Sequence, residues 1–464
     1  MKKLSIYILA AAILVTTGCK KTYDDTVGGK TADERIAAAM AAYQTKLTKA
    51  PYGWIMTEST TGTAYNQGVS QTGPVATFSY FMEFTDSNKV TMFSDFDTSM
   101  AATSKTSDFR VKSLQRPALI FDTYSYIHVP CDPLPTVSKS PYGVGYGWGT
   151  DFEFSFADNI DPSQLGDTIL LTGNLNSANA VLVKATKTQR DAYYAGQLKS
   201  TMLAWGNILN YFKLVSGAAT PFELTPGLGG AKSIDINWID AGNLKSAASS
   251  VYFTATSVNL VTPVKIGTQT ISNFNNIVWD AGTATINTSI NGSIAATITG
   301  SIAPLKNDLA APYTWWKGSV NSGSYYYSYN GYHVNGVDDF YGVTRLVKWW
   351  YMLFWAKYRA SGSTFYDANA GVVNGSLIGL ATFSPNPPPA TSATITTFTS
   401  DGRIIFKILG TFGSATSILN TTVRVQTLDA SGYYLILKED GKSYDMVVAS
   451  DAKAWLTWSP WWNQ

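Results

Sequence analysis

The sequence has few of the residues on which metal sites and nucleophilic catalysis depend. It contains two histidines and two cysteines among 464 residues. A tetrahedral zinc site needs about four such ligands, and the closely spaced pair His128 and Cys131 has no second pair to complete it. We therefore predict no metal site and no cofactor, although a calcium site made of carboxylates alone stays open.

Charged residues are scarce as well, at 14% of the chain where about 25% is usual. The formal net charge is +2 and no basic run is interleaved with aromatic residues, so nucleic acid is not expected as a partner. No serine stands in a nucleophile elbow, and two histidines offer little choice of a catalytic base. We predict that the protein is not an enzyme. The alternative, a glycoside hydrolase-type enzyme, needs paired carboxylates, for which the candidates are Asp122, Asp132, Asp151 and Glu153.

The N-terminus has the form of a bacterial lipoprotein signal. Lys2 and Lys3 precede an apolar run at residues 4–15, which is shorter than the roughly 20 residues that a membrane-spanning helix needs. The next residues, Thr-Thr-Gly-Cys, resemble a lipobox, with Thr16 where that motif usually has leucine. We predict a signal peptide at residues 1–18 and lipidation of Cys19, which would attach the protein to membrane lipid.

The predicted location is therefore the bacterial outer membrane. The sequence does not decide between the periplasmic and the outer face of this membrane. Residues 19–30 are polar and are predicted to form a tether between the lipid anchor and the first domain. With lipid on Cys19, Cys131 has no partner for an intrachain disulfide, so the fold must depend on its core.

Residues 31–215 are predicted to form a first domain with an N-terminal helix and a β-sheet. Thr31 and Glu34 have the spacing of a capping box, which marks a helix start. A second capped helix is expected near Thr188, with Asp191 three residues later, and its apolar side is expected to continue without a break from Tyr194 to Phe212. Between them the apolar period changes to two, as in strands. The predicted strands are TFSYFMEF, KVTMFSDF, PALIFDTYSYIHV, DFEFSFA, TILLTG and AVLVKAT.

Residues 216–464 are predicted to form a C-terminal β-rich domain. A hairpin is expected around Glu439-Asp440-Gly441, where turn residues separate two apolar strands. The segment TRLVKWWYMLFWAKYR is predicted to be a buried helix or a core strand. Other predicted strands are SVYFTATSVNLV, NIVWD, TATINTSI, SIAATITG, RIIFKIL and TTVRVQTL.

The predicted fold class is mainly β with a few helices. Short strands separated by turns favour antiparallel meander sheets that form barrel-like or sandwich domains, and a lipocalin-like barrel is one form that such a meander takes.

Aromatic residues are plentiful, at 13% of the chain, and supply the candidate binding residues. Exposed indole rings can stack on the C–H faces of sugars, whereas adjacent tryptophans on a strand point to opposite faces, one of them into the core. Both interpretations stay open. The candidate ligand-binding residues are Trp315, Trp316, Trp458, Trp461, Trp462, Tyr142 and Trp148.

Several segments together resemble a known family. They include KVTMFSDFD, FRVKSLQRPALIFDTYSYIHVPCDP, DFEFSFADN and DTILLTGNLNSANAVLVKAT, and the likeness extends from about Asp33 to Asp280. The chain resembles the lipoproteins catalogued as domain of unknown function 4302, found in Gram-negative gut and oral bacteria. The resemblance implies an outer-membrane lipoprotein, often encoded beside nutrient-uptake receptors, and supplies no catalytic residues.

The expected function is non-enzymatic capture of a ligand for uptake, with a glycan, a peptide or a similar nutrient as the ligand. The alternative from another class is a structural or accessory subunit of an outer-membrane transporter complex. A concave apolar cavity would favour capture, and a broad flat apolar patch would favour the accessory subunit.

Overall fold

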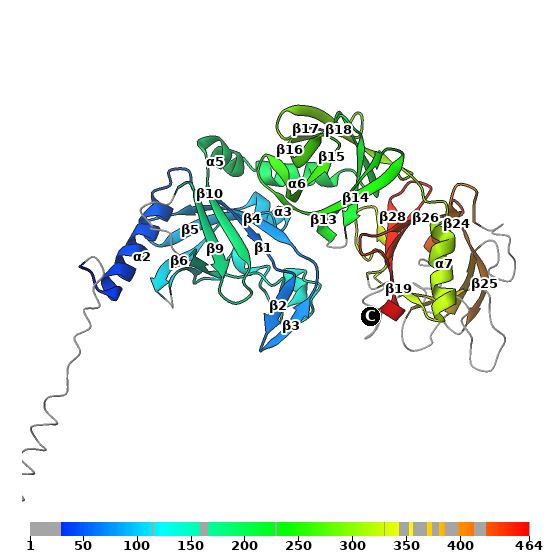
Figure 1. Cartoon of the computed structure of the whole chain (residues 1–464), viewed down its shortest axis with the longest axis horizontal. Helices are drawn as coiled ribbons and strands as arrows, with labels where there is room; N and C mark the ends of the chain where they lie inside the picture. The colour runs from blue at the N-terminus through cyan, green and yellow to red at the C-terminus, as the bar shows by residue number, and fades with distance from the viewer. Residues whose placement is uncertain are drawn as a thin grey trace, which may run out of the picture.

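The chain forms two closed eight-stranded barrels followed by a ten-stranded sheet (Figure 1). The fold is mainly β with few helices, which confirms the predicted fold class, and the first two sheets take the barrel form of the meander. The predicted signal peptide, Cys19 and most of the tether lie outside the described residues. The computed structural model describes residues 29–113, 116–157, 166–227, 230–328, 330–342, 352–355, 369–373, 380–385, 398–412 and 424–463.

The first barrel is an up-and-down meander in which β1 closes the ring by pairing with both β10 and β4. Helix α2 (Ala32–Thr48) precedes it, and the predicted capping box of Thr31 and Glu34 is present. A small hairpin, β2 (Thr63–Asn66) and β3 (Val69–Thr72), lies between β1 and β4 in the sequence and projects from the barrel (Figure 1). The barrel strands are β1 (Trp54–Ser59), β4 (Thr77–Phe84), β5 (Lys89–Ser94), β6 (Lys105–Ser113), β7 (Pro117–Phe121), β8 (Glu153–Phe156), β9 (Thr168–Gly173) and β10 (Asn179–Lys184).

The strand predicted as DFEFSFA differs from simple alternation. Phe154 and Phe156 are buried in the barrel as expected, but Phe152 is exposed and Asp151 is buried. The Asp151 carboxylate accepts hydrogen bonds from the backbone N–H groups of Leu175 (2.8 Å) and Asn176 (3.0 Å) in the β9–β10 turn. The backbone N–H groups of this turn need a hydrogen-bond acceptor, and Asp151 is buried because it supplies one. The apolar period of the sequence does not predict such a contact.

The helical region after the first barrel contains two helices, so the prediction of one continuous helix is wrong. Helix α5 (Lys187–Tyr194) is capped by Thr186, whose hydroxyl accepts from the Gln189 N–H, and not at Thr188. Helix α6 (Gln197–Gly206) begins after Gly196, which is left-handed at φ 75°. This conformation suits glycine and ends a helix, and the chain changes direction there.

The second barrel has the same closed antiparallel form, with β11 pairing both β12 and β18. Strand β11 crosses the domain boundary predicted between residues 215 and 216, and the later residues form two separate sheets. Its strands are β11 (Phe212–Ser216), β12 (Phe222–Gly227), β13 (Gly230–Asp240), β14 (Asn243–Phe253), β15 (Ser257–Ile266), β16 (Gln269–Asp280), β17 (Thr285–Ile290) and β18 (Ile294–Ser301).

The C-terminal sheet packs with helix α7 (Ala311–Ser322) and contains the predicted hairpin, β26 with β27. Of TRLVKWWYMLFWAKYR, the structure describes residues 352–355, which form a strand. The segment TTVRVQTL was predicted as a strand, but its described part contains helix α8 (Arg424–Thr427). The Tyr433 hydroxyl donates to the Gln426 carbonyl, a tertiary contact that holds this turn.

Strand order in this sheet does not follow the chain, since β28 lies between β27 and β19. Two-residue strand β20 (His333–Val334) pairs with β28 beside it. The strands are β24 (Arg403–Ile404), β26 (Tyr433–Leu437), β27 (Tyr444–Val448), β28 (Ala454–Pro460), β19 (Tyr326–Ser328), β21 (Met352–Trp355), β22 (Asn369–Val373), β23 (Leu380–Pro385) and β25 (Phe406–Phe412).

Candidate functional site

A cavity of about 640 Å³ lies where α6, one end of the second barrel and the C-terminal sheet meet. Helix α6 covers this barrel end, and its Leu198 and Ala204 join the barrel's interior core. Strands β20, β27 and β28 supply the opposite wall. The cavity therefore joins α6 and the second barrel, which are consecutive in the sequence, to strands that come much later in the chain.

The barrel side of the cavity is apolar. Met202 and Trp205 come from α6, and Leu224 and Phe253 come from the inner faces of β12 and β14. The Trp205 ring packs against Phe274 of β16, with ring centroids 5.4 Å apart. These contacts hold α6 against the barrel and leave one side of the indole at the cavity wall.

Lys213 of β11 is the charged group on this apolar side. Its register partners are Leu224 on β12 and Gly300 on β18. Its Nζ donates a hydrogen bond to the Asn210 carbonyl at 2.9 Å, and no described acidic side chain forms an ion pair with it. Burial lowers the pKa of Lys213 to about 8, because the charged form loses hydration.

The C-terminal wall carries an aromatic pair. The His333 ring stacks on Trp455 with centroids 3.7 Å apart, and both residues line the cavity. His333 Nδ1 lies 2.6 Å from an Asp338 carboxylate oxygen. This hydrogen bond lowers the pKa of Asp338 and orients the imidazole over the indole.

A buried ion cluster lies on the C-terminal side of the cavity. Lys438 Nζ is 2.9 Å from an Asp235 oxygen and 3.1 Å from an Asp445 oxygen. Asp445 also accepts hydrogen bonds from the Tyr211 and Thr457 hydroxyls, each at 2.6 Å. Burial opposes the charge of Lys438, but the two carboxylates prevail and raise its pKa. The cluster joins β13 of the second barrel to β27 and to the loop that follows β26, so it fixes the spacing of the cavity walls.

None of the seven predicted ligand-binding residues lines this cavity. Trp315, Trp316 and Trp458 are almost fully buried in the core of the C-terminal sheet, so their ring faces are not available as a surface platform. Trp315 and Trp316 belong to α7 and Trp458 belongs to β28, and their apolar area packs between this helix and the sheet, which stabilises the core more than exposure would. Trp461 is 38% exposed, and Trp462 packs partly against that core.

Tyr142 and Trp148 belong to the first barrel and are also buried, far from the tryptophan cluster in the chain. The Trp148 indole donates to the Ser138 carbonyl at 2.7 Å, and the Tyr142 hydroxyl donates to the Pro74 carbonyl at 3.1 Å. These bonds hold the loop at residues 142–149, which contains four glycines, against the barrel. The predicted candidates therefore form no single site.

The first barrel contains the other residues considered for chemistry, and four of them have structural contacts. His128 Nδ1 accepts from the Ser125 N–H at 3.1 Å, and the Cys131 thiol lies 3.2 Å from the Thr150 hydroxyl. Asp122 pairs with Arg110 at 2.5 Å, and Asp132 accepts from the Tyr124 hydroxyl at 2.7 Å. Across the described ranges, no group of three or more His, Cys, Asp or Glu side chains is placed to hold a metal ion.

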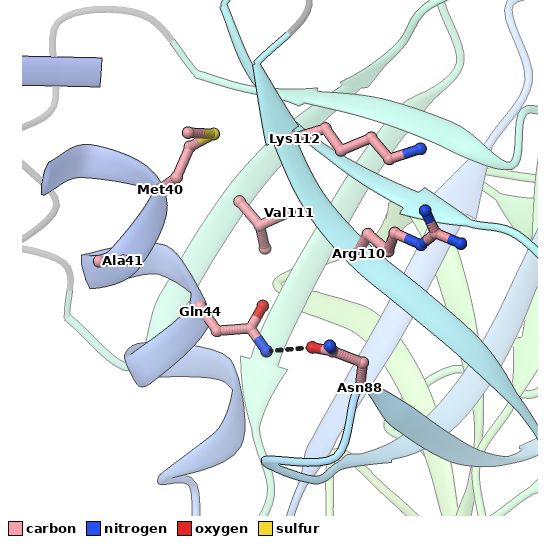
Figure 2. Close-up of a pocket in the computed structure, with 7 residues that line it drawn as sticks. All are labelled: Met40, Ala41, Gln44, Asn88, Arg110, Val111 and Lys112. Atoms are coloured by element: carbon pink, nitrogen blue, oxygen red, sulfur yellow. Dashed lines mark hydrogen bonds between the residues drawn. The ribbon is translucent and has the colours of Figure 1, made fainter. Parts of the chain in front are cut away.

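A second, shallower hollow lies between α2 and β6 (Figure 2). Its volume is about 310 Å³, and Met40, Gln44, Asn88 and Lys112 are among the residues around it. Gln44 donates to Asn88 across the hollow at 2.9 Å. Because these amide groups satisfy each other, this hollow is a weaker candidate than the cavity beside α6.

Sequence reasoning missed Trp205 and Lys213 as site residues. Lys213 interrupts the apolar run Tyr-Phe-Lys-Leu-Val at the start of β11, and a single charge on the apolar face of a strand is a signal that could have identified it. Trp455 stands three residues before Trp458, a predicted ligand-binding residue, but it is not itself among the predicted residues. No sequence pattern indicates that these three residues meet.

None of the helices in the described part of the chain is long and apolar enough to span a membrane. The family model described as Domain of unknown function (DUF4302) matches residues 24–281, more than half of the chain, and this confirms the resemblance seen in the sequence. The matched range includes the first barrel and ends between β16 and β17 of the second. No curated protein is recognisably similar to this chain.

Two solved structures align over most of the chain with low scores. The β subunit of DNA polymerase from Streptococcus pyogenes is 8% identical, with 92% of this chain and 98% of that chain covered and a TM-score of 0.13. The DNA polymerase sliding clamp from Caulobacter crescentus is 8% identical, with 92% and 97% covered and a TM-score of 0.13. At this TM-score neither likeness supports a conclusion about fold or function.

Proposed function

We propose that this chain, which belongs to the family of domain of unknown function 4302, captures a small nutrient molecule in the cavity beside α6 without chemical conversion. The observation that carries the proposal is the cavity itself, about 640 Å³ in volume. Ligand pockets are typically about 300–1,000 Å³, mostly apolar, with a few convergent polar groups. The apolar barrel side and the polar C-terminal side fit that description and favour a small amphipathic ligand over a long glycan.

A binding role is favoured over catalysis because the acidic groups at the cavity are already engaged. Asp445 is held by Lys438, Tyr211 and Thr457, and Asp338 by His333. A glycoside hydrolase needs one free carboxylate and one protonated carboxyl group across the substrate. An ion-paired Asp445 and an Asp338 with a lowered pKa are poorly suited to the second task.

We further propose that lipidation of Cys19 anchors the protein to the bacterial outer membrane. The signal-like residues 1–18 and the lipobox-like sequence before Cys19 support this address. The predicted tether, residues 19–30, would link the lipid to the folded part. Captured ligand would then be held close to the membrane for uptake.

The test is binding of N-phenyl-1-naphthylamine, an uncharged dye that becomes fluorescent in apolar sites, to the purified protein. We expect saturable binding with one site per chain. Leu209 lines the cavity, and Leu209→Trp should fill part of it and weaken dye binding about tenfold or more. The matched control is Leu203→Trp, because Leu203 lies nearby on α6 and is exposed outside the cavity.

Equal loss of dye binding in both variants would mean that a tryptophan at either position disturbs the fold, so that the loss is not specific to the cavity. Saturable binding that neither variant changes would place the dye elsewhere and contradict capture in this cavity. In that case the accessory-subunit alternative gains weight. The observation in its favour is the exposure of apolar side chains in the first domain, where Val144 is 74% exposed and Tyr65 of the projecting hairpin is 45% exposed.

A further inference from the structure

We propose that the cavity beside α6 selects organic anions, and that Lys213 is the residue that recognises the anionic group. The inference rests on the proposed capture function and names the class of ligand. The ligand would carry one anionic group, such as a carboxylate, on an apolar body. Its body would lie along the α6 and barrel wall, with the anionic group beside Lys213.

The position of Lys213 carries the first step of this argument. It extends from β11 on the same face as Leu224, its register partner, which belongs to the barrel's apolar core. An ammonium group can donate three hydrogen bonds, and the one found for Lys213 goes to the Asn210 carbonyl at 2.9 Å. Two donors remain to bind an anion in the cavity.

The charges around Lys213 carry the second step. On the strands beside it, the residues opposite are Leu224 and Gly300, which are uncharged. From α6 and the segment after it, the cavity lining is Met202, Trp205, Gly206, Ile208 and Leu209, also uncharged. The barrel side of the cavity is therefore positive at Lys213, with no described carboxylate paired to it.

The charged groups on the opposite wall are mostly paired among themselves. His333 bonds to Asp338, and Lys438 bonds to Asp235 and Asp445. Asp339 also lines the cavity from the loop after β20 and has interactions of its own. Four carboxyl groups against one lysine make this wall acidic despite the pairing. A carboxylate of the ligand is thus attracted to Lys213 and repelled by the acidic wall, which would orient the molecule along the cavity.

Protonation of Lys213 sets the pH range in which an anion binds. Its pKa of about 8 is lowered by burial alone, so roughly nine-tenths of the lysine is charged at pH 7 and about one-tenth at pH 9. We expect anion affinity to fall by up to about tenfold over this range. Lys438 keeps its charge over this range because its pKa is raised.

Two dyes with one apolar framework test the inference. The anion 8-anilino-1-naphthalenesulfonate differs from uncharged N-phenyl-1-naphthylamine by its sulfonate, so their comparison isolates the charge. In Lys213→Met we expect the dissociation constant for the anionic dye to rise about tenfold or more, as for the loss of a charged hydrogen bond. The uncharged dye should bind within about twofold of wild type. Lys213→Arg should retain the anionic dye and lose its dependence on pH between 7 and 9.

Four outcomes overturn the inference, and they are distinguishable. Unchanged binding of the anionic dye by Lys213→Met excludes recognition by this lysine. Loss of both dyes in a variant with native circular dichroism shows that Lys213 shapes the cavity without selecting charge. Displacement of the anionic dye by millimolar inorganic phosphate would assign the site to inorganic anions. Failure of wild type to bind either dye contradicts the capture function itself.

Unfolding of the Lys213→Met variant is not expected to obscure the result. Burial of a charged ammonium opposes folding, as the lowered pKa of Lys213 reflects, and methionine has a similar length without the charge. Thermal denaturation of the variant should therefore give a midpoint at or above that of wild type.

Discussion

Individual buried carboxyl groups make the stability of this protein sensitive to pH. Glu223 on β12 is only 4% exposed, and it accepts a hydrogen bond from the Leu305 N–H at 2.8 Å. Burial outweighs this bond and raises the pKa of Glu223 to about 7. Burial likewise raises the pKa of Glu58 inside the first barrel, where one of its oxygens has no partner. Both groups favour the protonated form when the protein is folded.

The direction in which stability changes with pH follows from the linkage between proton binding and folding. A carboxyl group whose folded pKa is above its unfolded value of 4.5 binds its proton more tightly when folded, so stability falls as pH rises from about 4.5 to about 7. For Glu223 the difference corresponds to at most about 3 kcal/mol. We predict that Glu223→Gln, which keeps an acceptor for Leu305, reduces the fall in unfolding free energy between pH 5 and pH 7.5.

Urea denaturation at several pH values measures this slope. The matched control is Asp86→Asn, because Asp86 is exposed and its pKa is lowered by Lys49. That substitution should leave the slope above pH 5 unchanged. A Glu223→Gln variant with the slope of wild type would show that Glu223 ionises freely in the folded protein.

At the scale of elements, the helices between the barrels depend on their ends. Helix α5 has eight residues, too few to be stable without caps and tertiary contacts. Thr186 and Gln189 satisfy each other's backbone N–H groups in a capping box. Gly196 then lets the chain turn into α6, which is the element that carries Met202 and Trp205 to the cavity.

We predict that Thr186→Ala lowers the unfolding free energy by about 1 kcal/mol, the usual effect of losing an N-cap. Thr188→Ala is the control, since Thr188 is exposed within the first turn of α5 and does not cap it. Alanine there should be neutral or slightly stabilising. Thermal denaturation of both variants measures the difference, and a larger loss in Thr188→Ala would contradict the assigned cap.

At the scale of the whole molecule, buried ion pairs join successive sheets. Asp95 of the first barrel lies 2.5 Å from Lys232 on β13 of the second, and Asp95 is fully buried. Its carboxylate also accepts from the N–H groups of Ser79 and Phe253, both at 2.8 Å. Lys438 with Asp235 and Asp445 does the same between the second barrel and the C-terminal sheet.

We predict that Asp95→Ala destabilises the chain by about 3–5 kcal/mol, because it leaves the Lys232 ammonium buried without its counter-ion. The double variant with Lys232→Met should recover part of that loss. The exposed pair Lys49–Asp86, at 2.8 Å, is the control, and its disruption should cost at most about 1 kcal/mol. Calorimetry measures all three, and equal effects of the buried and exposed pairs would contradict the joining role of Asp95.

Local patterns of the sequence determined those parts of the fold that depend on neighbouring residues. The capping box at Thr31 and Glu34, the strand TFSYFMEF and the hairpin around Glu439-Asp440-Gly441 were all predictable. Each needs contacts only within a few residues or between adjacent strands. The lipidation of Cys19 is likewise a prediction of local sequence.

Only the tertiary structure decided which strands close into barrels, which tryptophans are buried and where the cavity lies. Closure requires β1 to meet β10 more than a hundred residues later, and the cavity requires Trp205, Lys213 and Trp455 to come together. Periodicity shows that a side chain faces inward but does not show which distant element covers it. For that reason the sequence alone left open whether Trp315 and Trp316, which are core residues, bind a ligand, and it did not identify Lys213.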